Sequence, residues 1–96
     1  MQVICVVTRT TSKKDSDISP KMLDDEVNYV RRQYGENILR QIWNRGDANG
    51  AVLLLEVKDV EQAKSVIANL PLAKLGFLEL SSAMPALPYR GLSPAA

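Results

Sequence analysis

The strongest constraint on the fold of this chain is the excess of apolar side chains in two short segments. Residues Val3 to Val7 are apolar on both alternating faces, and the run from Val52 to Leu55 contains no polar residue. Strands of this composition are typical of the middle of a sheet that is covered on both sides. We therefore expect two central strands, each with two faces that must be removed from water.

Only two segments show the apolar spacing of an amphipathic helix, and both begin with an N-terminal signal. The first is predicted to start at Ser19 and Pro20, and the second at Asp59, with Gln62 completing a capping box. Pro71 is expected to end the second helix. The predicted core-facing positions are Met22, Leu23, Glu26, Val27, Val30 and Tyr34 in the first helix, and Val60, Ala63, Val66, Ile67 and Leu70 in the second.

Two further strands complete the expected elements. Residues 37–45 alternate incompletely, with Leu39, Gln41 and Trp43 predicted on one face, and residues 47–50 have the composition of a hairpin turn. Residues 77–82 are predicted to form the last strand. Polar residues 9–17 are predicted to be a loop, and residues 83–96 a non-helical C-terminal tail that lies across a surface.

The order β-α-β-β-α-β in a single domain of residues 1–96 predicts an α+β, ferredoxin-like fold. In this fold two helices cover one face of a four-stranded antiparallel sheet. The second face of the apolar central strands would then expose several hundred Å² of hydrocarbon. A second copy that packs its own sheet against this face is the simplest cover, so we expect a homodimer or a larger homo-oligomer.

Composition excludes several classes of function. Twelve basic residues nearly balance eleven acidic ones, so no field is expected to attract nucleic acid or an anionic membrane. The chain has no histidine and one cysteine, Cys5, which we interpret as an inert packing residue in a strand. We therefore expect no metal site, no cofactor and no disulfide. The lone cysteine and the lack of a long apolar run predict a cytoplasmic protein.

Several short motifs resemble a known family. They are Asp17–Pro20 before the first helix, Leu39–Trp43 in the second strand, Leu54–Val57 at the end of the third strand, and later Ala68–Leu72, Gly76–Leu80 and Leu87–Gly91. Over most of its length the chain is similar to the muconolactone isomerase-like members of the dimeric α+β barrel superfamily. The resemblance implies this dimeric fold and an isomerase that moves a double bond in an unsaturated lactone during aromatic compound catabolism.

Such an isomerase needs no cofactor, because it only takes a proton from carbon beside a carbonyl group and returns it elsewhere. One carboxylate of raised pKa, a cation near the developing enolate and a dry pocket are sufficient for this chemistry. The sequence departs from the family pattern in having no histidine, including in the tail, where related isomerases carry one.

Six residues are candidates for such a site. The proton carriers are expected to be Glu56, which interrupts the apolar third strand, or Glu26 on the core face of the first helix; the substrate-binding candidates are Arg40, Trp43, Tyr29 and Tyr89. Arg40 would hold a ligand carboxylate, Trp43 would form a pocket wall and the tyrosines would line its mouth. Each has a structural alternative, which is an ion pair for Arg40, Glu56 and Glu26 and packing for Trp43.

The sequence leaves two further functions open. The lack of histidine also fits a non-catalytic oligomer that binds a small apolar ligand or acts as an accessory module. A cofactor-free oxygenase of the same superfamily is a third interpretation, because this scaffold supports unrelated activities.

Overall fold

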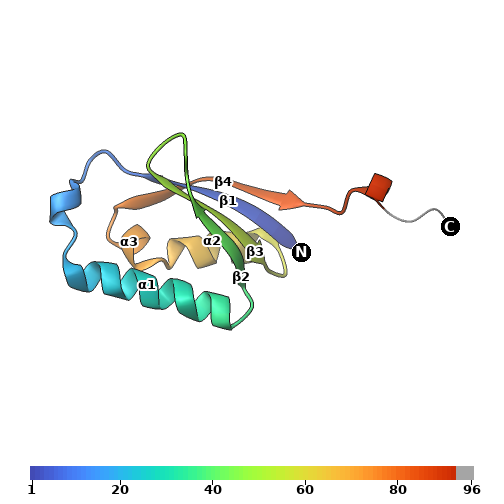
Figure 1. The fold of residues 1–96 in the computed structure, drawn as a ribbon, viewed down its shortest axis with the longest axis horizontal. Helices are drawn as coiled ribbons and strands as arrows, with labels where there is room; N and C mark the ends of the chain where they lie inside the picture. The colour runs from blue at the N-terminus through green and yellow to red at the C-terminus, as the bar shows by residue number, and fades with distance from the viewer. Residues whose placement is uncertain (93–96) are drawn as a thin grey trace.

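The computed structural model describes residues 1–92, which form a four-stranded antiparallel sheet with every α-helix of that range on one side (Figure 1). The sheet order is β2-β3-β1-β4, so β1 and β3 are the central strands, as predicted. The predicted ferredoxin-like order is confirmed. The elements are β1 (Gln2–Arg9), α1 (Pro20–Gly35), β2 (Leu39–Asn44), β3 (Gly50–Glu56), α2 (Val60–Ala68), α3 (Pro71–Lys74) and β4 (Leu78–Ala86), with 3-10 turns at Asp15–Asp17 and Arg90–Leu92.

Both predicted helix starts are confirmed by hydrogen bonds at their caps, although the side chain of Gln62 accepts a bond from the N–H of Lys58 and not from that of Asp59, as the predicted capping box requires. The hydroxyl oxygen of Ser19 accepts a bond from the backbone N–H of Met22 at 3.2 Å. A carboxylate oxygen of Asp59 accepts one from the N–H of Gln62 at 2.8 Å. These bonds satisfy backbone donors that the first turn of a helix leaves without a partner. Pro71 does more than end α2, because it occupies the first turn of the additional helix α3.

The hydrophobic core lies between the sheet and α2. Alternate residues of β1, namely Val3, Cys5 and Val7, have no exposed surface, and Leu55 of the neighbouring strand is equally buried. Helix α2 places Ala63, with no exposed surface, and its neighbour Ile67 against them. Because burial raises the pKa of the Cys5 thiol, the reactive thiolate is disfavoured there.

Helix α1 is less buried than predicted. Within this helix, all of which is described, no residue is fully buried, and Leu23, Val27 and Tyr34 are 49%, 44% and 64% exposed. The assignment of these three residues to the core is therefore wrong. The reason is position, because α2 lies over β1 and β4, whereas α1 packs against β2 and α3 at the side of the domain.

A β-bulge changes the faces of β2. Leu39 lies opposite Leu55, but after the irregularity Ile42 lies opposite Leu53 and Trp43 opposite Val52. Paired residues in an antiparallel sheet point to the same face, so Leu39 and Ile42 face the helices. The prediction that Leu39 and Trp43 share a face is therefore wrong, since the bulge inserts one residue between them.

Strand β4 is longer than predicted. Residues 83–86 belong to the strand and not to the tail, and Ala86 pairs with Gln2 of β1. Pro85 is tolerated there because β4 is an edge strand. The predicted tail also contains the 3-10 turn Arg90–Leu92. Its last part, residues 93–96, lies outside the described residues.

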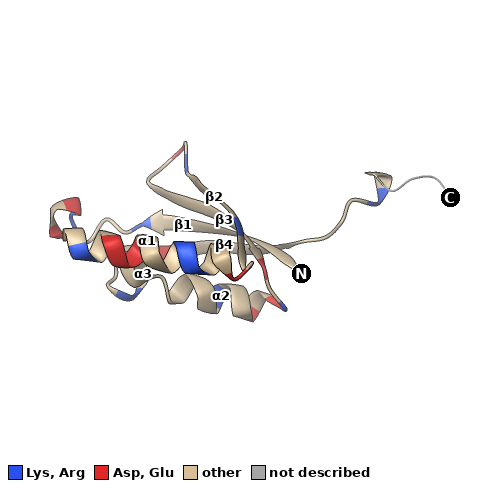
Figure 2. Ribbon diagram, turned by 60° about the horizontal axis from the view of Figure 1, so that its bottom comes forward, with Lys and Arg blue, Asp and Glu red and all other residues tan. Residues whose placement is uncertain are grey.

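The second face of the sheet carries no helix in the described chain (Figure 1). Strand alternation and pairing place six large apolar side chains there, which we call the open face: Ile4, Val6, Trp43, Val52, Leu54 and Met84. In Figure 2 the strands are largely free of charged residues, which concentrate on α1 and in the loops. The open face therefore has the composition of a surface that is buried in a complex.

Candidate functional site

A cleft lies between α1 and one end of the sheet. Its volume is about 480 Å³, and α1 contributes Glu26, Val27, Val30 and Arg31 to its lining. The sheet side is formed by the ends of β1, β2, β3 and β4, with Arg9, Ile42, Asn44, Gly50, Ala51 and Leu78. We call this hollow the α1 cleft. Its size and its apolar walls with a few polar groups are typical of sites for small organic ligands.

Glu26 brings a half-buried carboxylate to the α1 cleft. One of its oxygens accepts a hydrogen bond from the backbone N–H of Leu72 at 3.0 Å, which fixes the side chain toward the start of α3. Burial raises the pKa of Glu26, and the bond from Leu72 offsets part of that effect. A carboxyl group of raised pKa can both accept and return a proton near neutral pH.

Arg9 adds a fixed cation to the same cleft. It donates a hydrogen bond to the carbonyl oxygen of Phe77 at 3.1 Å, pairs with the carboxylate of Asp15, and lies 5.1 Å from the centre of the Phe77 ring. Its side chain is only 15% exposed. A guanidinium held by several partners is well prepared to bind a planar anion without a large loss of side-chain entropy.

Sequence reasoning missed Arg9 because it ended the first strand at Val7. In the structure β1 continues to Arg9, and the residue falls on the same face as Val3, Cys5 and Val7. The strand alternation, continued by two residues, would have placed this arginine under the helices.

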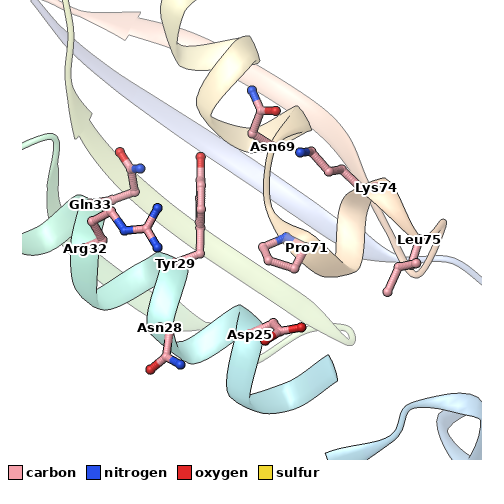
Figure 3. A pocket seen from close by; sticks show the side chains of 9 residues that line it. All are labelled: Asp25, Asn28, Tyr29, Arg32, Gln33, Asn69, Pro71, Lys74 and Leu75. Atoms are coloured by element: carbon pink, nitrogen blue, oxygen red, sulfur yellow. The ribbon is translucent and has the colours of Figure 1, made fainter. Parts of the chain in front are cut away.

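Tyr29 lies in a different hollow, between α1 and the α2–α3 segment (Figure 3). Its hydroxyl donates a hydrogen bond to the carbonyl oxygen of Val66 at 2.7 Å. Burial, and then the nearby Glu26 carboxylate, raise the pKa of Tyr29. Figure 3 shows mostly polar side chains around this hollow, among them Arg32, Lys74 and Asn69. Tyr29 therefore connects α1 to α2 through this hydrogen bond and does not line the α1 cleft.

The two candidates on β2 also lie outside the α1 cleft. Arg40 is exposed next to the bulge and forms no ion pair within residues 1–92. Trp43 is 49% exposed and belongs to the open face, opposite Val52. The roles of Arg40 and Trp43 in ligand binding stay predictions.

The last two candidates lie at the other end of the sheet. The Glu56 side chain is 46% exposed and accepts a hydrogen bond from the α-amino group of Met1 at 3.4 Å. Its neighbour is the chain terminus and not an apolar wall, and its role as a proton carrier stays a prediction. Tyr89 follows β4 and is 74% exposed. Of the six candidates, the structure places Glu26 alone in the α1 cleft.

The described part of the chain holds neither a candidate metal site nor a helix that could span a membrane. Residues 1–92 contain no group of three cysteine, aspartate or glutamate side chains that could hold a metal ion. Their helices are also too short or too polar to cross a bilayer.

Comparison with known proteins gave matches among solved structures. No family model matches this chain, and no curated protein matches it. Muconolactone isomerase superposes with a TM-score of 0.72 at 17% identity, over 100% of this chain and 98% of that one. A 5-chloro-2-hydroxyhydroquinone dehydrochlorinase from Burkholderia phenoliruptrix AC1100, solved with 2,5-dihydroxybenzoquinone, gives a TM-score of 0.64 at 13% identity, over 88% and 89%. At these identities the matches establish shared architecture, and this chain has the α+β fold of muconolactone isomerase.

Proposed function

We propose that this protein is a small cofactor-independent isomerase that moves a proton within an unsaturated lactone or small organic acid bound in the α1 cleft. The observation that carries the proposal is that a half-buried carboxylate, Glu26, and a fixed cation, Arg9, line one apolar cleft. Muconolactone isomerase, which shares the fold, supports this reaction class, and the dehydrochlorinase shows that the fold also accepts a small oxygenated ring.

The proposed step is a proton shuttle. The Glu26 carboxylate removes a proton from the carbon beside the substrate carbonyl, and the electrons of that C–H bond form an enolate. Arg9 stabilises the negative charge on the enolate oxygen. The protonated Glu26 then returns the proton two carbons away, the double bond moves into conjugation, and the carboxylate is regenerated. No electron acceptor or donor is consumed.

The cleft supplies two properties that this step requires. Apolar residues such as Val27, Val30 and Leu78 lower the local dielectric constant, which strengthens the attraction between Arg9 and an enolate. The raised pKa of Glu26 makes its carboxylate a stronger base than an exposed carboxylate, which favours removal of a proton from carbon.

The second part of the proposal is a homodimer formed through the open face. Six large apolar side chains lie on this face, and two copies related by a two-fold axis would bury both faces at once. The open face is separate from the α1 cleft, because the sheet lies between them. Dimer formation therefore leaves the cleft accessible to a small molecule.

Deuterium exchange tests the catalytic proposal directly. A β,γ-unsaturated lactone carrying a carboxylate is incubated with the protein in D₂O, and proton NMR follows exchange at the carbon beside the carbonyl and formation of the conjugated isomer. We expect both with the wild type, and a loss of about 10²- to 10⁴-fold in kcat/KM with Glu26→Gln. Glu61→Gln, on the exposed surface of α2, is the control and should keep full activity. Equal rates for the wild type and Glu26→Gln would remove Glu26 from the mechanism.

Two observations favour a second function, a binding module without catalysis. The carboxylate of Glu26 already accepts a bond from Leu72, and the chain has no histidine to assist a proton transfer. This module would bind an organic acid through Arg9 with no turnover. Concentration-dependent thermal stabilisation by the lactone, lost in Arg9→Gln and unaccompanied by deuterium exchange, would establish it.

A further inference from the structure

The hollow that contains Tyr29 is a second candidate binding site, which we call the polar hollow (Figure 3). One of its walls is α1, and the other is the segment from Asn69 to Leu75, at the end of α2 and through α3. Its volume is about 770 Å³, which lies within the range of sites for small organic molecules.

The polar hollow and the α1 cleft lie on different sides of α1. Asp25, Tyr29 and Arg32 recur at spacings of four and three residues, so they form one stripe of the helix, and this stripe lines the polar hollow. Val27 and Val30 belong to another stripe, which lines the α1 cleft. A ligand in the polar hollow would therefore leave the α1 cleft free.

Two basic side chains enter the polar hollow from opposite walls. Arg32 comes from α1 and Lys74 from α3, and Figure 3 shows them on the two sides of Tyr29. Neither forms an ion pair with another side chain of residues 1–92. Like charges that share a hollow repel each other, and an anion bound between them would replace this repulsion by attraction.

The acidic residue of the polar hollow does not neutralise these two cations. A carboxylate oxygen of Asp25 pairs with the ammonium group of Lys21 at 2.8 Å, and this hydrogen bond raises the pKa of Lys21. Asp25 also precedes Arg32 by seven residues, which is about 10 Å along the helix axis. The polar hollow therefore has an excess of positive charge.

Uncharged groups of the polar hollow add apolar surface and hydrogen-bond donors. Pro71 and Leu75 supply apolar surface on the wall opposite α1, and Leu75 is 42% exposed. The side-chain amide of Gln33 adds N–H donors on the α1 wall. A short hydrocarbon chain with an acid group at each end matches this combination of two cations, donors and apolar surface.

We propose that the polar hollow binds a small organic dicarboxylate, with one carboxylate on Arg32 and the other on Lys74. The guanidinium of Arg32 can bind a carboxylate through two parallel hydrogen bonds, and the ammonium group of Lys74 attracts the second carboxylate as a compact charge. The methylene groups between the two acids would lie on Pro71 and Leu75. The site takes no part in the proposed isomerase reaction.

Such a ligand would connect α1 to α3. Helix α1 has no fully buried residue, and its contacts with α3 include the hydrogen bond from Leu72 to Glu26. A dicarboxylate that bridges the two helices adds a further link between them. Binding should therefore slow local opening of α1 more than that of the central strands.

An NMR titration of the full-length, ¹⁵N-labelled protein tests the site. Succinate, glutarate, adipate and butyrate are added at constant ionic strength. We expect saturable shifts of the backbone amides of Asn69 and Leu75, whereas Gly50 and Ala51 report on the α1 cleft. The dicarboxylate that binds most tightly should have a dissociation constant at least about tenfold below that of butyrate, which lacks the second acid group.

Variants of the two cations identify the binding groups. Arg32→Gln and Lys74→Gln should each weaken dicarboxylate binding at least about tenfold, and Lys74→Arg, which keeps the charge, should retain it. Lys64→Gln is the matched control, because it removes a lysine that is exposed on α2 outside the polar hollow. It should bind the dicarboxylate as the wild type does.

Hydrogen exchange provides a second measurement. At a saturating concentration of the dicarboxylate, exchange in α1 should be severalfold slower in the wild type and unchanged in Arg32→Gln. The inference is overturned if Asn69 and Leu75 show no saturable shift, if butyrate binds as tightly as the dicarboxylates, or if exchange in α1 does not respond. None of these results would affect the deuterium exchange that tests the catalytic step, because Arg32 and Lys74 do not line the α1 cleft.

Discussion

The two faces of the sheet are built from the same kinds of residue and differ in what covers them. Val7 and Val6 are neighbours in β1, and Leu55 and Leu54 are neighbours in β3. Val7 and Leu55 have no exposed surface, whereas Val6 and Leu54 are only partly buried. Apolar content alone therefore does not define the core of one chain. A strand with two apolar faces specifies two interfaces, and the helices of a single chain satisfy one of them.

The largest expected effect is the loss of stability when a side chain is shortened on the face of the sheet that the helices cover. Leu55→Ala should lower the free energy of unfolding by about 2–5 kcal/mol, because it leaves a cavity in a closely packed core. Leu54→Ala, the matched change on the open face, should cost less than half as much when both are measured by denaturant unfolding in dilute solution, where the proposed dimer is dissociated. Equal losses would mean that the two faces are equally buried in the monomer.

The next effect concerns the open face in the assembly. Leu54→Asp places a charge where two sheets are proposed to meet, and it should raise the dissociation constant of the dimer at least about a hundredfold, or about 2.7 kcal/mol. Ser12→Asp, in an exposed loop, should leave it unchanged. Light scattering after size exclusion measures both. A wild-type protein that is monomeric at all concentrations would contradict the proposed use of the open face.

Most of the fold could be predicted from the sequence because its signals are local. Ser19 and Asp59 act on backbone groups within three residues, so their helix starts can be identified without knowing the rest of the chain. The exposure of α1 could not be predicted, because its apolar spacing does not say whether the helix lies over the middle or the side of a sheet. The bulge after Leu39 is equally hidden, since it depends on pairing with Leu55.

The site was harder to predict than the fold because its residues meet through tertiary structure. Glu26 could be identified because it lies among the predicted core-facing positions of α1, and such a position indicates burial. Glu56 carried a similar signal in β3, but the α-amino group of Met1 lies beside it, 55 positions away in the chain. Arg9 was missed at a strand end, where sequence gives boundaries least reliably.

A prediction of intermediate size distinguishes α2, which lies over the middle of the sheet, from α1, which lies at its side. Ser19→Ala removes the cap of α1 and should cost about 1 kcal/mol of stability. Because α1 contributes no fully buried residue, hydrogen exchange should speed up in α1 and β2 more than in α2 and β1. Ser16→Ala, in the preceding exposed turn, is the control. Uniform acceleration across the sheet would show that α1 and the core unfold together.

The smallest expected effect is the pH dependence that Glu26 gives to the stability of the folded protein. Its pKa in the folded state is raised above the ordinary value of 4.5, so the folded protein holds this proton more tightly than the unfolded chain does. The resulting stabilisation is fully present below pH 4.5 and is lost as the pH rises through the raised value. The hydrogen bond from the backbone N–H of Leu72 limits this loss, because it favours the charged carboxylate.

Glu26→Gln removes this titration and retains an oxygen that can accept the bond from Leu72. We therefore expect the variant to gain stability relative to the wild type between a pH below 4.5 and neutrality, as measured by the difference in unfolding midpoint. Glu61→Gln, on exposed α2, shows how much of any change comes from net charge alone. If Glu26→Gln instead lost stability relative to the wild type as the pH rose, the carboxylate would be stabilised as a charge in the cleft. Glu26 would then be better suited to form an ion pair with Arg9 than to carry a proton.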